Sequence, residues 1–188
     1  MTALKTEYRL SFASGLTIET SNHLRTRIAT ILEQPNFGSL TLLFSSEGGS
    51  TDQSLALYNF LRLLPVPIHM HAVGHVGSAA IPLFLGAEKR TCEENARFFF
   101  HEYDWGFTER QTLQRIDEAV QRLNSDIQIA RDIIRERSNI DLAILDTLDG
   151  TAKPVVVTPR KAREMGLVSD ILTLPTSGPD GAPIAIWT

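Results

Sequence analysis

Short apolar runs alternate along the chain with longer segments in which apolar residues recur every three or four positions. A short apolar run is typical of a strand, and the three-or-four spacing is typical of a helix. Strands are therefore predicted at residues 8–12, 40–44, 68–73, 97–101, 154–157 and 167–172. Because these strands alternate with helices, we expect an α/β fold with a mainly parallel core sheet.

The helical pattern predicts the segments that connect these strands. The first helix is expected to start at an N-cap formed by Ser21 or Asn22 and to continue through Glu33. Further helices are predicted at residues 51–64, 79–85, 110–137, 140–148 and 159–165. The pattern at 110–137 is longer than the roughly 10 to 14 residues of an average globular helix, so this helix either crosses a large domain or projects toward a partner.

Three features that carry chemistry follow expected strands. Residues 74–80 (Gly-His-Val-Gly-Ser-Ala-Ala) are predicted to form a turn between a strand and a helix, with Ser78 at its tip. The N–H groups and the dipole at a helix N-terminus favour negative charge, which makes Ser78 a candidate nucleophile beside an oxyanion site. Residues 45–50 (Ser-Ser-Glu-Gly-Gly-Ser) form a second glycine turn, and His101 ends a third strand.

In this order and spacing, the three features resemble the ClpP family, the proteolytic subunits of the Clp protease, and more broadly the Clp/crotonase fold. The resemblance covers residues 40–172 and implies a repeated β-β-α spiral with a long protruding helix. It also implies a serine endopeptidase that needs no cofactor and no metal ion. By position in the family's motifs, Ser78 corresponds to the nucleophile, His101 to the general base, and Gly49 and Ala79 to the donors of the oxyanion N–H groups.

The family's triad also contains an aspartate, which lies just ahead of the strand that enters the closing helix. An ungapped count places Pro154 at this position, and proline cannot serve as the acid. Asp149 and Asp146 are the nearest acids before it, and Asp170 follows the closing helix. We choose Asp149, because residues 150–153 could loop out and bring it to the same place. The alternative is that the acid is absent or is replaced by another polar group.

Two other functions remain open at this point. One is a crotonase-like acyl-CoA enzyme, which shares the fold and stabilises an enolate with two backbone N–H groups. The other is a non-catalytic ClpP-like subunit that assembles into a ring, because fold alone does not determine function. The residues that depart from the family's usual ones are Glu47, Ala80, Glu102 and Tyr103. Ser78 and His101 at the peptidase positions favour hydrolysis.

Length and composition indicate how many domains the chain has, which partners suit it and which compartment it occupies. The 188 residues predict one domain at 1–174 followed by a turn-rich tail at 175–188, in which residues 184–187 could attach to a neighbour. A formal net charge of −4 offers no basic field for nucleic acid. The single cysteine, Cys92, fits a reducing compartment, so we expect the cytoplasm. No apolar run reaches the roughly 18 to 20 residues of a membrane helix, so no membrane association is expected.

The remaining expectations concern metals and assembly. His69 and His71 lie on one face of a predicted strand and His75 lies nearby, but a third ligand at suitable spacing is missing, so packing roles are preferred to a zinc site. Cys92 belongs to a charged connection predicted at residues 86–95. The resemblance implies a homo-oligomeric ring and unfolded peptide or protein substrates. The resemblance also implies an ATPase unfoldase as a partner, but the family contacts it through a longer N-terminal segment, and here little precedes the first expected strand, which argues against this partner.

Overall fold

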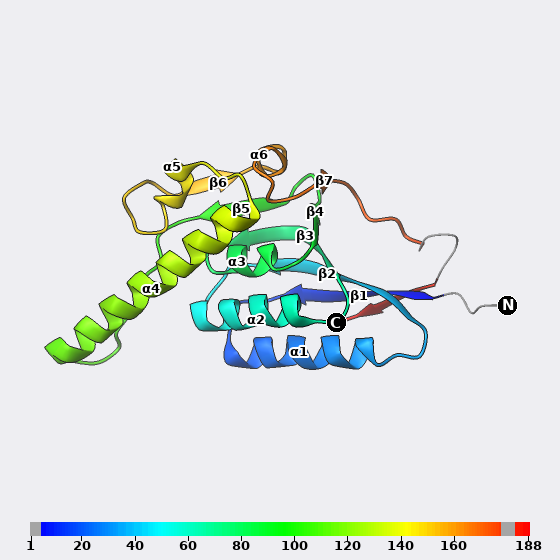
Figure 1. Ribbon diagram of the computed structural model, residues 1–188, viewed down its shortest axis with the longest axis horizontal. Coiled ribbons are helices and arrows are strands. Elements are labelled where there is room, and N and C mark those ends of the chain that lie inside the picture. The colour runs from blue at the N-terminus through cyan, green and yellow to red at the C-terminus, as the bar shows by residue number, and fades with distance from the viewer. Residues whose placement is uncertain (1–4, 178–182) are drawn as a thin grey trace.

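The computed structural model describes residues 5–177 and 183–188. Within them one eight-stranded sheet has the order β6-β5-β3-β2-β1-β8, and β4 pairs with both β3 and β7 (Figure 1). Every pairing is parallel except that of β5 with β6. The strands are β1 (Thr6–Ala13), β2 (Phe37–Ser46), β3 (Ile68–Gly77), β4 (Lys89–Cys92), β5 (Arg97–Phe100), β6 (Val155–Val157), β7 (Asp170–Ile171) and β8 (Ile184–Trp187). The predicted α/β fold with a mainly parallel core sheet is confirmed.

The helices follow one another in space as they do in the sequence. Contacts join α1 to α2, α2 to α3 and α3 to α4, so these helices form one row along the sheet (Figure 1). The helices are α1 (Ile18–Leu32), α2 (Thr51–Leu63), α3 (Ala80–Leu85), α4 (Leu113–Arg137), α5 (Leu142–Leu145) and α6 (Pro159–Glu164). No helix in the described part of the chain is both long enough and apolar enough to span a bilayer.

The first helix starts earlier than predicted. Thr17, not Ser21 or Asn22, is its N-cap, because Thr17 and Thr20 each accept a hydrogen bond from the other's backbone N–H. Two reciprocal bonds satisfy two of the N–H groups that a helix start leaves unpaired. Ser21 is fully buried within the helix instead. The last predicted helix, α6, has the expected Thr158 cap and proline at its first turn.

Two strands of the sheet were not predicted from the sequence. The segment at 86–95 contains β4, whose backbone pairs with β3 and β7 despite its charged side chains. Part of the predicted tail forms β8, which pairs with β1 of the same chain. Residues 178–182 of the predicted turn-rich tail lie outside the described residues.

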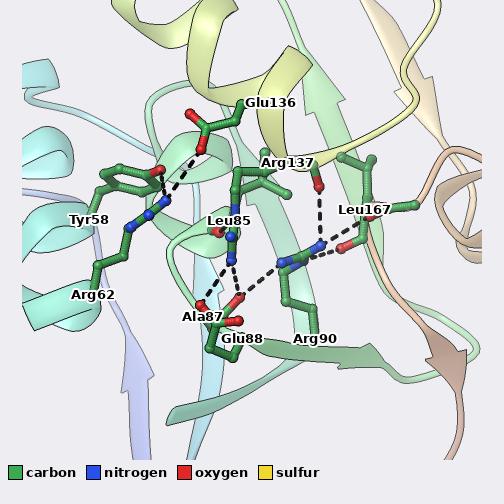
Figure 2. A network of polar contacts seen from close by, with 10 residues as sticks. Tyr58, Arg62, Leu85, Ala87, Glu88, Arg90, Glu136, Arg137 and Leu167 are labelled. Carbon is green, nitrogen blue, oxygen red and sulfur yellow. Dashed lines mark hydrogen bonds and ion pairs between the residues drawn. The ribbon is translucent and has the colours of Figure 1, made fainter. Parts of the chain in front are cut away.

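One end of α4 is anchored and the other projects. Figure 1 shows the N-terminal half of this helix extending beyond the sheet. Figure 2 shows the anchor at its C-terminal end, where the Arg137 guanidinium donates to the backbone carbonyls of Leu85 (3.2 Å) and Ala87 (3.3 Å). The half-buried Arg90 donates in turn to the carbonyls of Arg137 (3.2 Å) and Leu167 (2.9 Å). These bonds fix the end of α4 to β4 and to the closing segment after α6.

Candidate active site

Ser78 lies at the junction of β3 and α3, in a strained backbone conformation. Its φ is 53°, and it is the one residue other than glycine with a positive φ in the described part of the chain. Its N–H donates to the carbonyl of Phe99 on β5 at 2.9 Å, and its carbonyl accepts from the N–H of Ile81 in α3 at 3.0 Å. The strand and the helix thus hold Ser78 from both sides. Its side chain stays half-buried at the surface of the domain.

The turn before Ser78 is shorter than the sequence suggested. β3 was expected to end at residue 73, but it continues to Gly77, because Val76 pairs with Ser46 of β2 and Gly77 pairs with Phe99 of β5. Two neighbouring strands therefore keep the glycine-containing segment extended. The reversal of the chain is confined to Ser78 itself.

The second glycine turn packs directly against this reversal. A Cβ on Gly48 would lie 2.7 Å from the carbonyl oxygen of Gly77 and 2.9 Å from the Cβ of Ser78. A Cβ on Gly49 would lie 2.7 Å from the carbonyl oxygen of Leu16. Both glycines also have positive φ, of 98° and 131°. Neither position can carry a side chain without displacing backbone.

The predicted oxyanion donors belong to these two turns. Hydrogen bonds from Leu16 to the carbonyl of Gly48 and from Ser50 to the carbonyl of Leu16 fix the chain on both sides of Gly49. Among the hydrogen bonds of the described residues, none uses the N–H of Gly49 or of Ala79. The Ser54 hydroxyl of α2 donates to the carbonyl of Ala79 and holds that peptide in place. Free N–H groups on a fixed backbone are what an oxyanion hole requires.

His101 follows β5, two residues after Phe99. Its ring stacks on that of Phe99, with centroids 5.0 Å apart, and it is half-buried. Because the Ser78 N–H bonds the Phe99 carbonyl, the fold brings His101 to the neighbourhood of Ser78. The two side chains share no hydrogen bond within the described residues. Such contacts are often loose without substrate and tighten in the Michaelis complex.

Asp149 is exposed, and its carboxylate already has partners. The Thr151 hydroxyl donates to it at 2.6 Å and Arg131 forms an ion pair with it. The hydrogen bond from Thr151, assisted by Arg131, holds the pKa of Asp149 below its usual value, so the group is ionised at neutral pH. Its turn lies beside the segment after His101, because the Tyr103 N–H donates to the carbonyl of Leu148 at 3.0 Å. No hydrogen bond joins Asp149 to His101 among the described residues.

Comparison with known proteins identifies the family. The family model described as Clp protease matches residues 1–175. The chain belongs to the Clp protease family. It is therefore a serine endopeptidase of the ClpP type, and the crotonase-like alternative loses its support.

Similar Clp protease subunits come from bacteria and plants. The chain is 25% identical over 178 residues to the ATP-dependent Clp protease proteolytic subunit 1 of Rhodopirellula baltica, covering 88% of this chain and 73% of the relative. It is equally identical over 178 residues to subunit 1 of Thermobifida fusca, covering 88% and 75%. The subunit of Illicium oligandrum is 25% identical over 177 residues, covering 93% of this chain and 86% of the relative.

Cys92, His69 and His71, three other reactive side chains of this Clp protease, are committed to packing and hydrogen bonds elsewhere in the fold. Cys92 is fully buried, and burial raises the pKa of its thiol to about 11, so it stays protonated. His69 and His71 both hydrogen-bond the Thr91 hydroxyl at 2.7 Å. Within the described residues, no three His, Cys, Asp or Glu side chains are grouped as metal ligands would be.

Sequence reasoning missed three residues next to the site. Gly48 was recognised only as part of a turn, although it packs on Ser78 more closely than Gly49 does. Ser54 gave no signal, because its role depends on where α2 packs. Asp126 did leave a signal, since it is an acid within the stripe of α4 that also contains the buried Ile127 and Ala130.

Proposed function

We propose that this Clp protease cleaves peptide bonds by acyl transfer through Ser78 and His101. The observation that carries the proposal is the strained Ser78 at a strand–helix junction, with its N–H bonded to the strand that leads to His101. The His101 imidazole takes the hydroxyl proton as the Ser78 oxygen attacks the scissile carbonyl. The N–H groups of Gly49 and Ala79 hold the resulting oxyanion.

The rest of the cycle regenerates the serine. Protonated His101 gives its proton to the leaving amine, which departs and leaves an acyl ester on Ser78. Water then loses a proton to His101 and attacks the ester, and the peptide acid is released. This chemistry needs no metal ion and no cofactor.

The natural substrates and the assembly are part of the same proposal. The relatives' names describe proteolytic subunits of an ATP-dependent protease. We infer that this chain likewise forms a homo-oligomeric ring and acts on unfolded peptides or proteins. An ATPase unfoldase as the partner that delivers substrates belongs to this inference, as does a cytoplasmic location.

Hydrolysis of a short fluorogenic peptide tests the mechanism. Ser78→Ala and His101→Asn should each lower the turnover by several orders of magnitude, because a catalytic triad acts as a unit. Both variants should keep the melting temperature of the parent protein. A peptidase activity that survives in Ser78→Ala would contradict the proposal. Absence of activity in the parent protein, with the ring intact, would favour a non-catalytic subunit.

Asp149 remains the proposed acid that orients His101. The support is its ionised state and its turn beside the segment that follows His101. To take this role, its carboxylate must exchange contacts with Arg131 for one with His101. Asp149→Asn should then lower peptidase turnover toward the roughly ten-thousand-fold loss known for other triads. A loss of less than about threefold would indicate a Ser/His dyad. Asp132→Asn, on an exposed residue of α4, is the matched control.

A further inference from the structure

The first turn of α2 is connected to both proposed oxyanion donors. It begins at Thr51, shortly after Gly49. Further along the same turn, the Ser54 hydroxyl donates to the carbonyl of Ala79. The separation of the Gly49 and Ala79 N–H groups therefore depends on where this turn lies. A side chain that fixes the turn also fixes the pair of donors.

Asp126 of α4 holds this turn. Its Oδ2 accepts a hydrogen bond from the Thr51 hydroxyl at 2.6 Å, and the residue is only 7% exposed. Buried carboxylates are normally paired with a cation, yet no ion pair among the described residues involves Asp126. The N-terminus of a helix favours negative charge, so the start of α2 compensates this carboxylate in place of a cation. Hydrogen bonds to a charged acceptor are stronger than neutral ones, which suits Asp126 to hold Thr51 firmly.

Tyr103 supplies an unused donor beside the same carboxylate. It follows His101 closely in the chain and lines one narrow space together with Asp126 and Thr51. Its hydroxyl is buried without a hydrogen-bond partner in the described part of the chain, although a buried tyrosine hydroxyl normally finds one. Burial and, after it, the charge of Asp126 raise the pKa of Tyr103, so the hydroxyl stays protonated and can donate.

The partner of this hydroxyl must come from the protein itself. The space between these side chains is too narrow for a water molecule. Of the described residues that line it, Asp126 alone carries a negative charge. Because a charged acceptor forms the stronger bond, the Asp126 carboxylate is the preferred partner for the Tyr103 hydroxyl.

We propose that Asp126 is a positioning residue for the oxyanion site and accepts hydrogen bonds from Thr51 and Tyr103 together during catalysis. The bond from Thr51 is already formed, and a small approach of Tyr103 to the carboxylate completes the second. The two bonds join the segment after the oxyanion glycine to the segment after the general base, so they hold both at a fixed separation. Asp126 touches neither the substrate nor the reacting atoms. The inference rests on the proposed peptidase function and adds a residue that acts through the site's own backbone.

Thr51→Val removes the bond that is already formed, because valine keeps the shape of threonine and lacks its hydroxyl. We expect kcat for a fluorogenic peptide to fall about tenfold or more while KM stays within about threefold of the parent, since an oxyanion site stabilises the transition state. The affinity for a peptide boronate, whose adduct with Ser78 places an oxygen at the oxyanion site, should fall by a similar factor. Thr51→Ser restores the hydroxyl and should keep kcat within about threefold of the parent.

Asp126→Asn removes the charge from the same contact. It should lower kcat and boronate affinity at nearly unchanged KM, and combining it with Thr51→Val should add little, because both changes disrupt one interaction. Each kcat is expressed per Ser78 that a fluorophosphonate labels at the end point, so an unfolded fraction does not count as lost turnover. The matched controls are Asp132→Asn, at an exposed acid of α4, and Thr26→Val, at an exposed threonine of α1, and both should behave as the parent.

Tyr103→Phe examines the second bond and covers the case in which Thr51→Val does not fold. The hydroxyl that it removes has no partner in the structure, so the melting temperature should not fall. Because the hydroxyl completes the pair of bonds during catalysis, kcat should nevertheless drop several-fold at unchanged KM. An unchanged kcat in either variant overturns the inference, provided that the parent cleaves the peptide. A parent protein that is neither labelled on Ser78 nor able to cleave overturns the proposed function and this inference with it.

Discussion

The candidate chemistry depends on the strained backbone conformation of a single residue, Ser78. A positive φ at a residue other than glycine costs of order 1–3 kcal/mol, and the surrounding contacts must hold it in place. Here a strand bond to Phe99 and the close packing of Gly48 do so. The strained residue is thus fixed beside β5, the strand that leads to His101.

Gly48→Ala should therefore remove activity although Gly48 contributes no side chain. The added Cβ would lie within 3.0 Å of one atom each of Gly77, Ser78 and Ala79. The alanine would also have to adopt a positive φ. We expect peptidase turnover to fall at least about a hundredfold, comparable with the loss of one oxyanion donor. Peptide hydrolysis measures this. Gly15→Ala is the control, because a Cβ there makes only an ordinary 3.6 Å contact. Equal activity of both variants would contradict the account of this turn.

Which residues the sequence could predict depends on whether a local motif carries them. Ser78 and Gly49 stand in turns with recognisable spacing, so their candidacy was visible before the structure. The packing of Gly48 on Ser78 and the bond from Ser54 to Ala79 join segments that are distant in sequence. Such contacts follow from tertiary packing, which no local pattern encodes.

At the scale of elements, β3 explains both a failed prediction and a stability property. Glycines at 74 and 77 suggested a turn, but ladders to β2 and β5 keep the strand extended through them. Upstream on the same strand, His69 and His71 hydrogen-bond the hydroxyl of Thr91 on β4. The sequence predicted the strand and the common face of these histidines. It could not predict how far each is covered or its bond to Thr91, which both depend on β4.

The buried His71 and the half-buried His69 should make stability depend on pH. Burial, together with the charge of Lys89, lowers the pKa of His69 to about 4, and burial also lowers the pKa of His71. In the unfolded chain each histidine binds a proton once the pH falls below its ordinary pKa of about 6.5. In the folded chain both histidines stay neutral to a lower pH, so protonation favours the unfolded chain. The stabilisation that comes from keeping these histidines neutral should thus be fully present above about pH 6.5. The free energy of unfolding should fall as the pH is lowered from there toward 4.

Urea unfolding between about pH 7 and pH 4.5 measures this loss. His69→Gln should flatten the pH dependence, because it removes the group with the larger resolved shift. His23→Gln, on the exposed surface of α1, should leave it as in the parent protein. A pH dependence that is the same in all three proteins would show that His69 does not cause it.

At the scale of the whole molecule, the projecting half of α4 exposes apolar side chains to solvent. Leu113, Ile116 and Val120 are 81%, 40% and 52% exposed along it. The hydrogen bonds of Arg90 and Arg137 hold the other end of the helix against β4 and the segment before it. Contiguous apolar surface of this kind usually marks an interface. The helical period predicted the helix and its stripe, but which half is left uncovered could be seen only in the fold.

We expect the protein to be a ring-forming homo-oligomer with this half of α4 at a contact between copies. Light scattering at micromolar concentration should give a mass several times that of one chain. Leu113→Glu combined with Val120→Glu should lower the mass, because it places charges in the apolar contact. Ile18→Glu, at an exposed apolar residue of α1, should not. A monomeric mass for the parent protein would rule out this assembly.

The most direct test of the account is covalent labelling by a fluorophosphonate followed by mass spectrometry of the intact protein and its peptides. The account predicts one added label per chain, located on Ser78. It also predicts no label on Ser78→Ala and slow labelling of His101→Asn, with both variants folded as the parent. Labelling of another serine, or equal labelling of Ser78→Ala, would contradict the assignment of Ser78 as the nucleophile.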